Sequence, residues 1–304
     1  MNHCCYFICA PTATGKSSLA IRLAKKIKGK IVNADSMQVY SNLEILTARP
    51  SKANCETVEH LLYGYVHGSE RYNVAKWCND ISKIITKNKK SNTPLIIVGG
   101  TGMYIQSLIN GIIDMPAIDE DQKKESYNLL KRIGLKNFIN TIDNFDPNSL
   151  KNISLNDNSR IRRIWEVYNS TGTSLSDWKK KQNKKYVSDL NYKIFLFTPL
   201  REMIYQNVNT RFKAMLNNGA LKEVQDLLYL NLNKTLPIMR AHGVPEISNY
   251  LNKKCTLEEC IKKGQQVTRN YVKRQLTWWR SSSLPIDQVF KEFPNDIDEN
   301  LIKI

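Results

Sequence analysis

Short apolar runs without a helical period recur along the chain, and they predict β-strands. They lie at 4–10, 30–34, 94–98 and 191–199. Between them, apolar residues recur every three or four positions over 17–28 and 74–88, which predicts amphipathic helices. Strands that alternate with helices predict an α/β fold with a parallel sheet.

The texture of the sequence changes after about residue 115. Residues 119–190 show helical periodicity and polar loops but no convincing strand. We therefore expect a mainly helical insertion at 118–190, in a core formed by 1–117 and 191–304. Further helical stripes predict C-terminal helices at 203–217, 221–230, 245–251 and 257–279. The last twenty residues show no regular pattern and are expected to be loosely structured.

The net charge of the chain indicates the kind of partner that it binds. The 304 residues carry 45 Lys and Arg against 28 Asp and Glu, a net charge of +17 that is spread along the chain. Such an excess favours a polyanionic partner such as nucleic acid, although many lysine-rich proteins bind none. No apolar run approaches the roughly 18 residues that span a membrane. The seven cysteines have no zinc-site spacing, and Cys4, Cys5 and Cys9 lie in an apolar run, which favours buried thiols in a reducing compartment. Since the N-terminus also lacks a signal-peptide pattern, we expect a cytoplasmic location.

The first candidate for chemistry is the loop after the first strand, which reads APTATGKS at 10–17. A strand, a loop ending in Gly-Lys-Ser and a helix, in this order, predict a phosphate-binding loop. The backbone N–H groups and the dipole at the helix start attract an anion. Lys16 adds a positive charge, and the Ser17 hydroxyl can ligate Mg²⁺. Ala10 replaces the usual first glycine, which is tolerable where φ is not positive.

Two more polar segments follow strands of the predicted sheet. Asp35 comes after the second strand, and Gly99–Gly102, which includes Thr101, comes after the third. Carboxyl ends of parallel strands meet at one crevice, so both are expected near the phosphate loop. Asp35 can bind Mg²⁺ or accept a proton, and its alternative role is a helix N-cap. The glycines permit close approach to a ligand, or simply form a tight turn.

Six segments together resemble one family, the bacterial tRNA dimethylallyltransferases. They are, in order, APTATGKS, NADSMQVYSNLEILTARPS, PLIIVGGTGMY, RIRRIWEVYNSTGTSLS, RAHGVPEISNYL and TRNYVKRQLTWWR. The resemblance covers about residues 6–280 and implies a P-loop kinase-like core with a helical insertion. The sequence departs from the family's usual residues at Ala10, Met37, Arg49 and 240–245.

The resemblance also implies an activity. It is the transfer of a dimethylallyl group from dimethylallyl diphosphate to N6 of adenine 37, beside the anticodon, in tRNAs that read codons beginning with U. By resemblance, Asp35 is the general base, Thr101 contacts the reacting centre and Arg211 neutralises the leaving pyrophosphate. The implied diphosphate- or nucleotide-binding residues are Ala10, Pro11, Thr12, Ala13, Thr14, Gly15, Lys16 and Ser17, with Mg²⁺ as cofactor on Ser17. We expect a monomer.

The resemblance places tRNA contacts on both the core and the insertion. They are Asp35, Ser36, Met37, Gln38, Thr101, Lys123, Ser159, Arg160, Ile161, Arg162, Arg163, Arg240, Gly243, Lys273, Arg274 and Arg280. The residues themselves give partial support, because the apolar stripe of 161–168 leaves Arg160, Arg162 and Arg163 beside it. A solvated helix face is the alternative. Trp278 and Trp279 favour core packing over base stacking.

Two other functions stay open at this point. A small-molecule or nucleoside kinase would use ATP in the same phosphate loop, although it gives no reason for a basic helical insertion. A non-catalytic RNA-binding protein with a vestigial loop would keep its RNA affinity after the loss of Lys16 or Asp35. A transferase is the interpretation that uses the loop, Asp35 and the basic helices together.

Overall fold

The computed structural model describes residues 4–151 and 153–303, which form two compact units. The first unit holds the chain up to Ile109 and again from Tyr186, and the second holds Asn110–Lys185. The second unit begins and ends a few residues earlier than the predicted insertion at 118–190. Ile112 and Lys184 exchange backbone hydrogen bonds of 3.2 and 2.8 Å, and this antiparallel bridge joins the two ends of the second unit.

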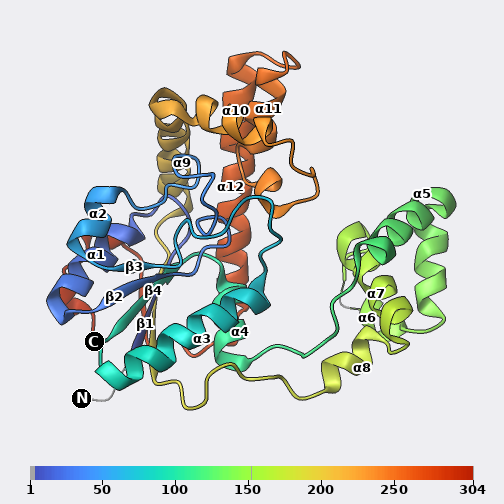
Figure 1. Ribbon diagram of the computed structural model, residues 1–304, viewed down its shortest axis with the longest axis horizontal. Helices are drawn as coiled ribbons and strands as arrows, with labels where there is room; N and C mark the ends of the chain where they lie inside the picture. Colours follow the sequence, from blue (N-terminus) through green and yellow to red (C-terminus); the bar gives the residue numbers. More distant parts are fainter. Residues whose placement is uncertain (1–3, 152, 304) are drawn as a thin grey trace. The chain divides into compact units, whose positions relative to one another are not determined.

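The first unit is built on a parallel sheet. Within the described residues it has six strands in the order β3-β2-β4-β1-β5-β6 (Figure 1). The predicted α/β fold with a P-loop kinase-like core is confirmed, and its central strands lie where the apolar runs predicted them. The strands are β1 (Cys5–Cys9), β2 (Lys30–Asn33), β3 (His60–Leu61), β4 (Leu95–Gly99), β5 (Tyr192–Phe197) and β6 (Gln288–Phe290).

Helices cover both faces of this sheet. Alternate residues of β4 point to opposite faces, so Ile96 and Val98 join one core and Leu95 and Ile97 join the other. The first face packs on α1 (Lys16–Ile27), with α2 (Lys52–Thr57) on the same side in Figure 1. The second packs on α3 (Val74–Ser91) and α4 (Gly102–Asn110). Burial on both faces explains why these strands are uniformly apolar.

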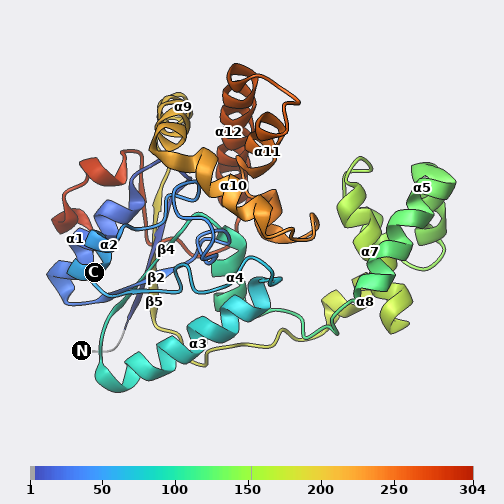
Figure 2. The same ribbon diagram turned by 45° about the horizontal axis from the view of Figure 1, so that its top comes forward.

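Four helices follow β5 and extend beyond the carboxyl edge of the sheet. In Figures 1 and 2, α9 and α12 run side by side. A π-helical turn at Leu216–Ala220, with Gly219 at φ 104°, bends the chain between α9 and α10. The long α12 begins with a capping box in which Thr256 and Glu259 satisfy each other's backbone N–H. The helices are α9 (Arg201–Met215), α10 (Leu221–Tyr229), α11 (Val244–Leu251) and α12 (Leu257–Ser281).

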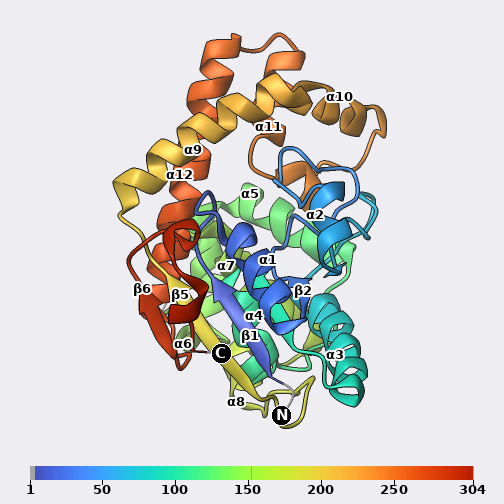
Figure 3. The same cartoon turned by 90° about the vertical axis from the view of Figure 1, so that its left-hand side faces the viewer.

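The C-terminal segment is ordered, so the expectation of loose structure there is wrong. Residues 288–290 form β6 at the edge of the sheet beside β5 (Figure 3). The ring of Phe290 stacks on Phe197 with 4.8 Å between centroids. Arg22 of α1 donates hydrogen bonds to the carbonyls of Pro294 (3.2 Å) and Ile297 (2.8 Å). Two 3₁₀ turns, Pro294–Asp296 and Glu299–Leu301, complete this segment.

The second unit is helical. Its core packs Phe138 and Ile142 against Ile161, Ile164 and Trp165. The helices are α5 (Glu120–Asp143, kinked at Gly134), α6 (Pro147–Leu150), α7 (Asn158–Thr171) and α8 (Leu175–Lys180). In the described part of both units, no helix combines the length and apolarity that crossing a bilayer requires.

Candidate active site

The predicted phosphate-binding loop lies between β1 and α1. Helix α1 begins after Gly15, whose φ of 79° is in the region that favours glycine, and no described side chain caps its first amides. Within the described residues, the N–H groups of Thr14 and Gly15 also lack hydrogen bonds. Ala10 has no positive φ, which explains why alanine is tolerated there, whereas Ala13 does adopt a φ of 63°. Unbonded amides at a helix start form an anion site.

Contacts from distant helices hold this loop in shape. Gln275 of α12 accepts the Thr12 N–H (3.0 Å) and donates to the Gly100 carbonyl (2.9 Å), so it joins the loop to the glycine turn after β4. Arg211 of α9 donates to the Thr12 hydroxyl at 2.6 Å. Inside the loop, the Thr14 hydroxyl donates to the Pro11 carbonyl at 2.8 Å. These hydrogen bonds fix the conformation of the loop without a ligand.

Asp35 is held at the carboxyl end of β2 by the buried amide of Asn33. The Asn33 side chain accepts the Asp35 N–H (2.8 Å) and donates to the Asp35 carbonyl (2.9 Å). Asp35 Oδ1 accepts the N–H groups of Met37 (2.8 Å) and Gln38 (3.3 Å). Its Oδ2 has no hydrogen-bond partner among the described residues, so one lone-pair-bearing oxygen is available to a ligand.

The loop and Asp35 border one cavity of about 400 Å³ in the first unit. Its apolar wall includes Met37, Leu46, Phe212 and Met215. Among its described lining residues Asp35 is the only acid, and the arginines are Arg71, Arg211 and Arg240. The cavity thus combines a cationic end for an anion, an apolar wall and one carboxylate.

Burial lowers the pKa of both Lys16 and Arg211. It lowers the pKa of Lys16 to about 8, an effect that the Asp35 charge opposes and Arg211 reinforces. Burial likewise lowers the pKa of Arg211 to about 10, again opposed by Asp35. The single charge of Asp35 does not offset the burial of two neighbouring cations, and a bound diphosphate would stabilise both.

The lowered pKa of Lys16 predicts a pH dependence for anion binding. Below about pH 8 the ammonium is charged, so affinity for inorganic pyrophosphate should not depend on this group. Above pH 8 the free protein must take up a proton to bind, so affinity should fall by up to about tenfold per pH unit. The measurement is calorimetric titration from pH 6 to 9, with Lys16→Arg as control because its guanidinium stays charged. A constant ratio of wild-type to variant affinity over this range would contradict the prediction.

Oxygen ligands suit the predicted Mg²⁺. Ser17 is the second residue of α1, beside the uncapped amides, and a hydroxyl together with diphosphate oxygens is a ligand set that Mg²⁺ accepts. No group of three or more His, Cys, Asp or Glu side chains in 4–151 and 153–303 could hold a metal by itself. The residues therefore fit a Mg²⁺ that enters with a diphosphate.

Other predicted residues of the first unit lie around this cavity. The Ser36 N–H donates to the Thr101 hydroxyl at 3.4 Å, which places Thr101 beside the Asp35 segment although it is not among the cavity's lining residues. Gln38 donates to the carbonyls of Thr47 and Ala48, at 2.9 and 3.1 Å. Gly243 is buried, and a Cβ there would come within 2.7 Å of Leu46.

The predicted tRNA contacts fall into three structural groups. Arg240 and Arg274 line a second hollow of about 280 Å³, which shares Arg240, Ala241 and His242 with the main cavity. On α12, Lys273 and Arg280 are exposed, while Trp279 is buried in the core and Trp278 packs on Gly102.

The third group lies in the second unit, described by itself. Arg160 is exposed and forms an ion pair with Asp157 at 3.3 Å, and Ser159 is exposed beside it. Arg162 and Arg163 are half-buried, and Lys123 pairs with Glu120 at 2.8 Å. The Ile161 side chain is fully buried, so only its backbone is left for a ligand.

Sequence reasoning missed several residues that shape the cavity. Gln275, Asn33 and Glu223 act through hydrogen bonds, and Tyr271 and His242 line the cavity with ring centroids 4.7 Å apart. A signal was present for two of them. Asn33 is a polar residue at the end of an apolar strand, and Gln275 is a polar residue on the buried stripe of α12.

Comparisons with known proteins agree on one family. The sequence profile of the family described as IPP transferase matches residues 38–282. The chain is 38% identical over 274 residues to the tRNA dimethylallyltransferase of Ehrlichia canis, which covers 90% of each chain. It is 39% identical over 275 residues to that of Pelagibacter ubique, covering 90% of this chain and 87% of the relative.

Solved structures show the same similarity. One is the tRNA delta(2)-isopentenylpyrophosphate transferase of Staphylococcus epidermidis, at 27% identity and a TM-score of 0.67, covering 99% of this chain and 96% of that one. Another is a eukaryotic dimethylallyltransferase acting on tRNA, at 27% identity and a TM-score of 0.74, covering 91% of this chain and 70% of that one.

Proposed function

Because the chain belongs to the IPP transferase family, whose curated relatives are tRNA dimethylallyltransferases, we propose that this enzyme transfers a dimethylallyl group from dimethylallyl diphosphate to N6 of adenine 37 of tRNA. The products are N6-(dimethylallyl)adenosine and diphosphate. The tRNAs are those that read codons beginning with U, bound by the anticodon stem-loop. The monomeric state and the cytoplasmic location stay predictions from the sequence.

One observation carries this proposal. Asp35, Arg211 and an apolar wall line one cavity, and the charge of Lys16 interacts with both Asp35 and Arg211. A five-carbon isoprenoid requires the apolar wall, and its diphosphate requires the cations. A kinase that binds ATP in this loop would need the cations but not an apolar wall at the carboxylate.

The reaction balances with these groups. The adenine amino nitrogen forms a bond to C1 of the dimethylallyl group as the C1–O bond breaks, and the bonding electrons leave with the diphosphate. Asp35 Oδ2 accepts the proton lost from the nitrogen, which is a weak nucleophile because its lone pair is delocalised into the ring. Lys16, Arg211 and the loop amides stabilise the charge that grows on the leaving oxygen. Mg²⁺, bound with the diphosphate at Ser17, would add further charge neutralisation there.

The adenine must leave its stack to reach Asp35, because the cavity is too small for a paired base within a helix. Aromatic and apolar side chains in its lining suit a flipped base, and Tyr271 and His242 contribute rings to that lining. Basic residues on the surface would bind the flanking phosphates.

The experiment that tests the substrate assignment compares tRNAs. The protein, Mg²⁺ and labelled dimethylallyl diphosphate are incubated with an unmodified tRNA that reads a UNN codon, and with the same tRNA carrying guanine at position 37. We expect label in the first tRNA alone, located at adenine 37 after nuclease digestion. Label at another nucleotide, or equal labelling of both tRNAs, would contradict the assignment.

The basic face of α7 gives a separate prediction about tRNA binding. Arg160 is exposed, so replacing it with alanine should remove one phosphate interaction, weaken tRNA binding and reduce the slope of log K against log salt by roughly 0.9. Fluorescence anisotropy of labelled tRNA with Arg160→Ala between 50 and about 200 mM salt measures this. Lys179→Ala, which removes an exposed cation of the same unit that is not among the predicted tRNA contacts, is the control. An unchanged slope in Arg160→Ala would remove this helix from the tRNA contacts.

A further inference from the structure

The segment Leu43–Arg49, here called the wall segment, forms part of the cavity. It is a hydrogen-bonded turn in which the Thr47 hydroxyl donates to the Leu43 carbonyl (2.9 Å) and the Arg49 N–H to the Glu44 carbonyl (3.0 Å). Leu46 and Thr47 line the cavity. The wall segment therefore places two side chains against the ligand space that Asp35 borders.

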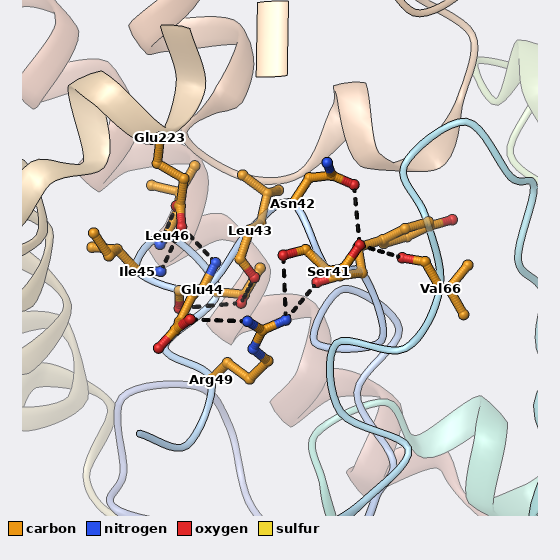
Figure 4. Close-up of polar contacts among 11 residues, drawn as sticks. Ser41, Asn42, Leu43, Glu44, Ile45, Leu46, Arg49, Val66 and Glu223 are labelled. Carbon is orange, nitrogen blue, oxygen red and sulfur yellow. Dashed lines mark hydrogen bonds and ion pairs between the residues drawn. The ribbon is translucent and has the colours of Figure 1, made fainter. Parts of the chain in front are cut away.

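Glu223 of α10 binds the start of the wall segment through its carboxylate (Figure 4). Its Oε1 accepts the N–H of Ile45 at 2.8 Å as well as that of Glu44, and its Oε2 accepts the N–H of Leu46 at 2.9 Å. Among the described residues, these three amides have no backbone hydrogen-bond partner, so the carboxylate satisfies them. The carboxylate is thus a cap supplied from a distant part of the chain.

The wall segment is connected to Asp35 through Gln38. The Gln38 side chain donates to the carbonyls of Thr47 and Ala48, and the Gln38 N–H donates to Asp35 Oδ1. A displacement of the wall segment would therefore pull on the residue that orients the carboxylate. It would also move Leu46, which packs closely against Gly243.

Glu223 is not needed to pack its own helix. Val224 and Leu227 bury the apolar face of α10 in the core, and Glu223 is only half-buried. Arg49 adds a separate tie, donating to the Tyr40 carbonyl at 3.0 Å and pairing with Glu44 at 2.9 Å (Figure 4). Among the described hydrogen bonds at the start of the wall segment, only those of Glu223 link it to α10.

We propose that Glu223 is a positioning residue of the transfer reaction, which acts by holding Leu46 and Thr47 in the cavity wall and, through Gln38, the carboxylate of Asp35. The inference rests on the proposed function, because the effect on rate presupposes transfer at Asp35. Misplacement of reacting groups by about 1 Å can cost on the order of 100-fold in rate. Glu223→Ala should therefore lower kcat/KM by about 10- to 100-fold. We expect kcat to fall because Asp35 is displaced, and KM for the donor to rise because Leu46 is displaced.

The test compares Glu223→Ala and Glu223→Gln with Asp226→Ala, which removes an exposed carboxylate from the same helix. Glutamine keeps one acceptor oxygen, so it should restore part of the kcat/KM, and Asp226→Ala should match the wild type. Leu46→Ala and the double variant Leu46→Ala/Glu223→Ala complete a cycle. Because both act on one segment, we expect the double variant to lose less than the product of the two single losses.

Amide hydrogen exchange tests the same inference without relying on dimethylallyl transfer. The amides of Glu44, Ile45 and Leu46 should exchange at least about tenfold faster in Glu223→Ala and at the wild-type rate in Asp226→Ala. Provided that the wild type is active, three results would each overturn the inference. They are unchanged exchange in Glu223→Ala, unchanged kcat/KM in Glu223→Ala, and a double variant whose loss of kcat/KM equals the product of the two single losses. A wild-type protein that transfers no label would instead overturn the proposed function, and the inference with it.

Discussion

Replacing Asp35 with asparagine is expected to lower the rate of dimethylallyl transfer by a factor on the order of 10³, the typical contribution of a positioned general base. Asparagine can still accept the Met37 and Gln38 N–H groups through Oδ1, so the local backbone should keep its shape. The atom it lacks is the free, basic Oδ2. The loss should therefore appear in kcat, measured in single turnover, with little change in tRNA affinity.

Two controls accompany Asp35→Asn. Asp226→Asn removes an exposed carboxylate far along the chain and should keep the wild-type rate. Anisotropy with labelled tRNA should give Asp35→Asn a dissociation constant close to that of the wild type. A variant that retains the full rate of transfer would show that the proton leaves by another route, and Asp35 would then be a structural cap.

Lys16→Ala is expected to have the second-largest effect, a loss of about 10² to 10³ in kcat/KM for the donor. Lys16 is the only cation contributed by the phosphate loop itself, and burial makes its interaction with a diphosphate stronger than in water. Both donor binding and the departure of pyrophosphate depend on this charge, so KM should rise and kcat should fall.

The matched control is Lys25→Ala, which removes an exposed cation from the same helix. It should leave kcat/KM unchanged, as measured with labelled dimethylallyl diphosphate and unmodified tRNA. If Lys16→Ala transfers label as efficiently as Lys25→Ala, then the loop does not hold the donor and the assignment of its anion site fails.

The parts of the fold that were predicted from sequence are those whose residues interact with near neighbours in the chain. The four longer strands have apolar runs because helices cover both of their faces, and α1 and α12 carry regular stripes for the same reason. The strands β3 and β6 were missed because two or three residues carry no period. They exist only because they pair with β2 and β5.

In the candidate site, too, the residues that were predicted are those whose position depends on neighbouring residues in the chain. The phosphate loop and Asp35 were visible because each follows a strand directly, which fixes its place at the carboxyl edge of the sheet. The contacts of Gln275 and Glu223 join segments more than 170 residues apart in the chain. No local pattern records such a pairing, because a glutamine or glutamate on a helix is also an ordinary surface residue.

The most direct test of the whole account is a competition between donors. Unmodified tRNA that reads a UNN codon, Mg²⁺ and the protein are supplied with labelled dimethylallyl diphosphate and ATP at equal concentration. We predict that the dimethylallyl label enters the tRNA with release of one pyrophosphate per transfer, that ATP is not consumed, and that Asp35→Asn blocks the incorporation. Consumption of ATP with no label in the tRNA would contradict the account and assign the phosphate loop to a kinase.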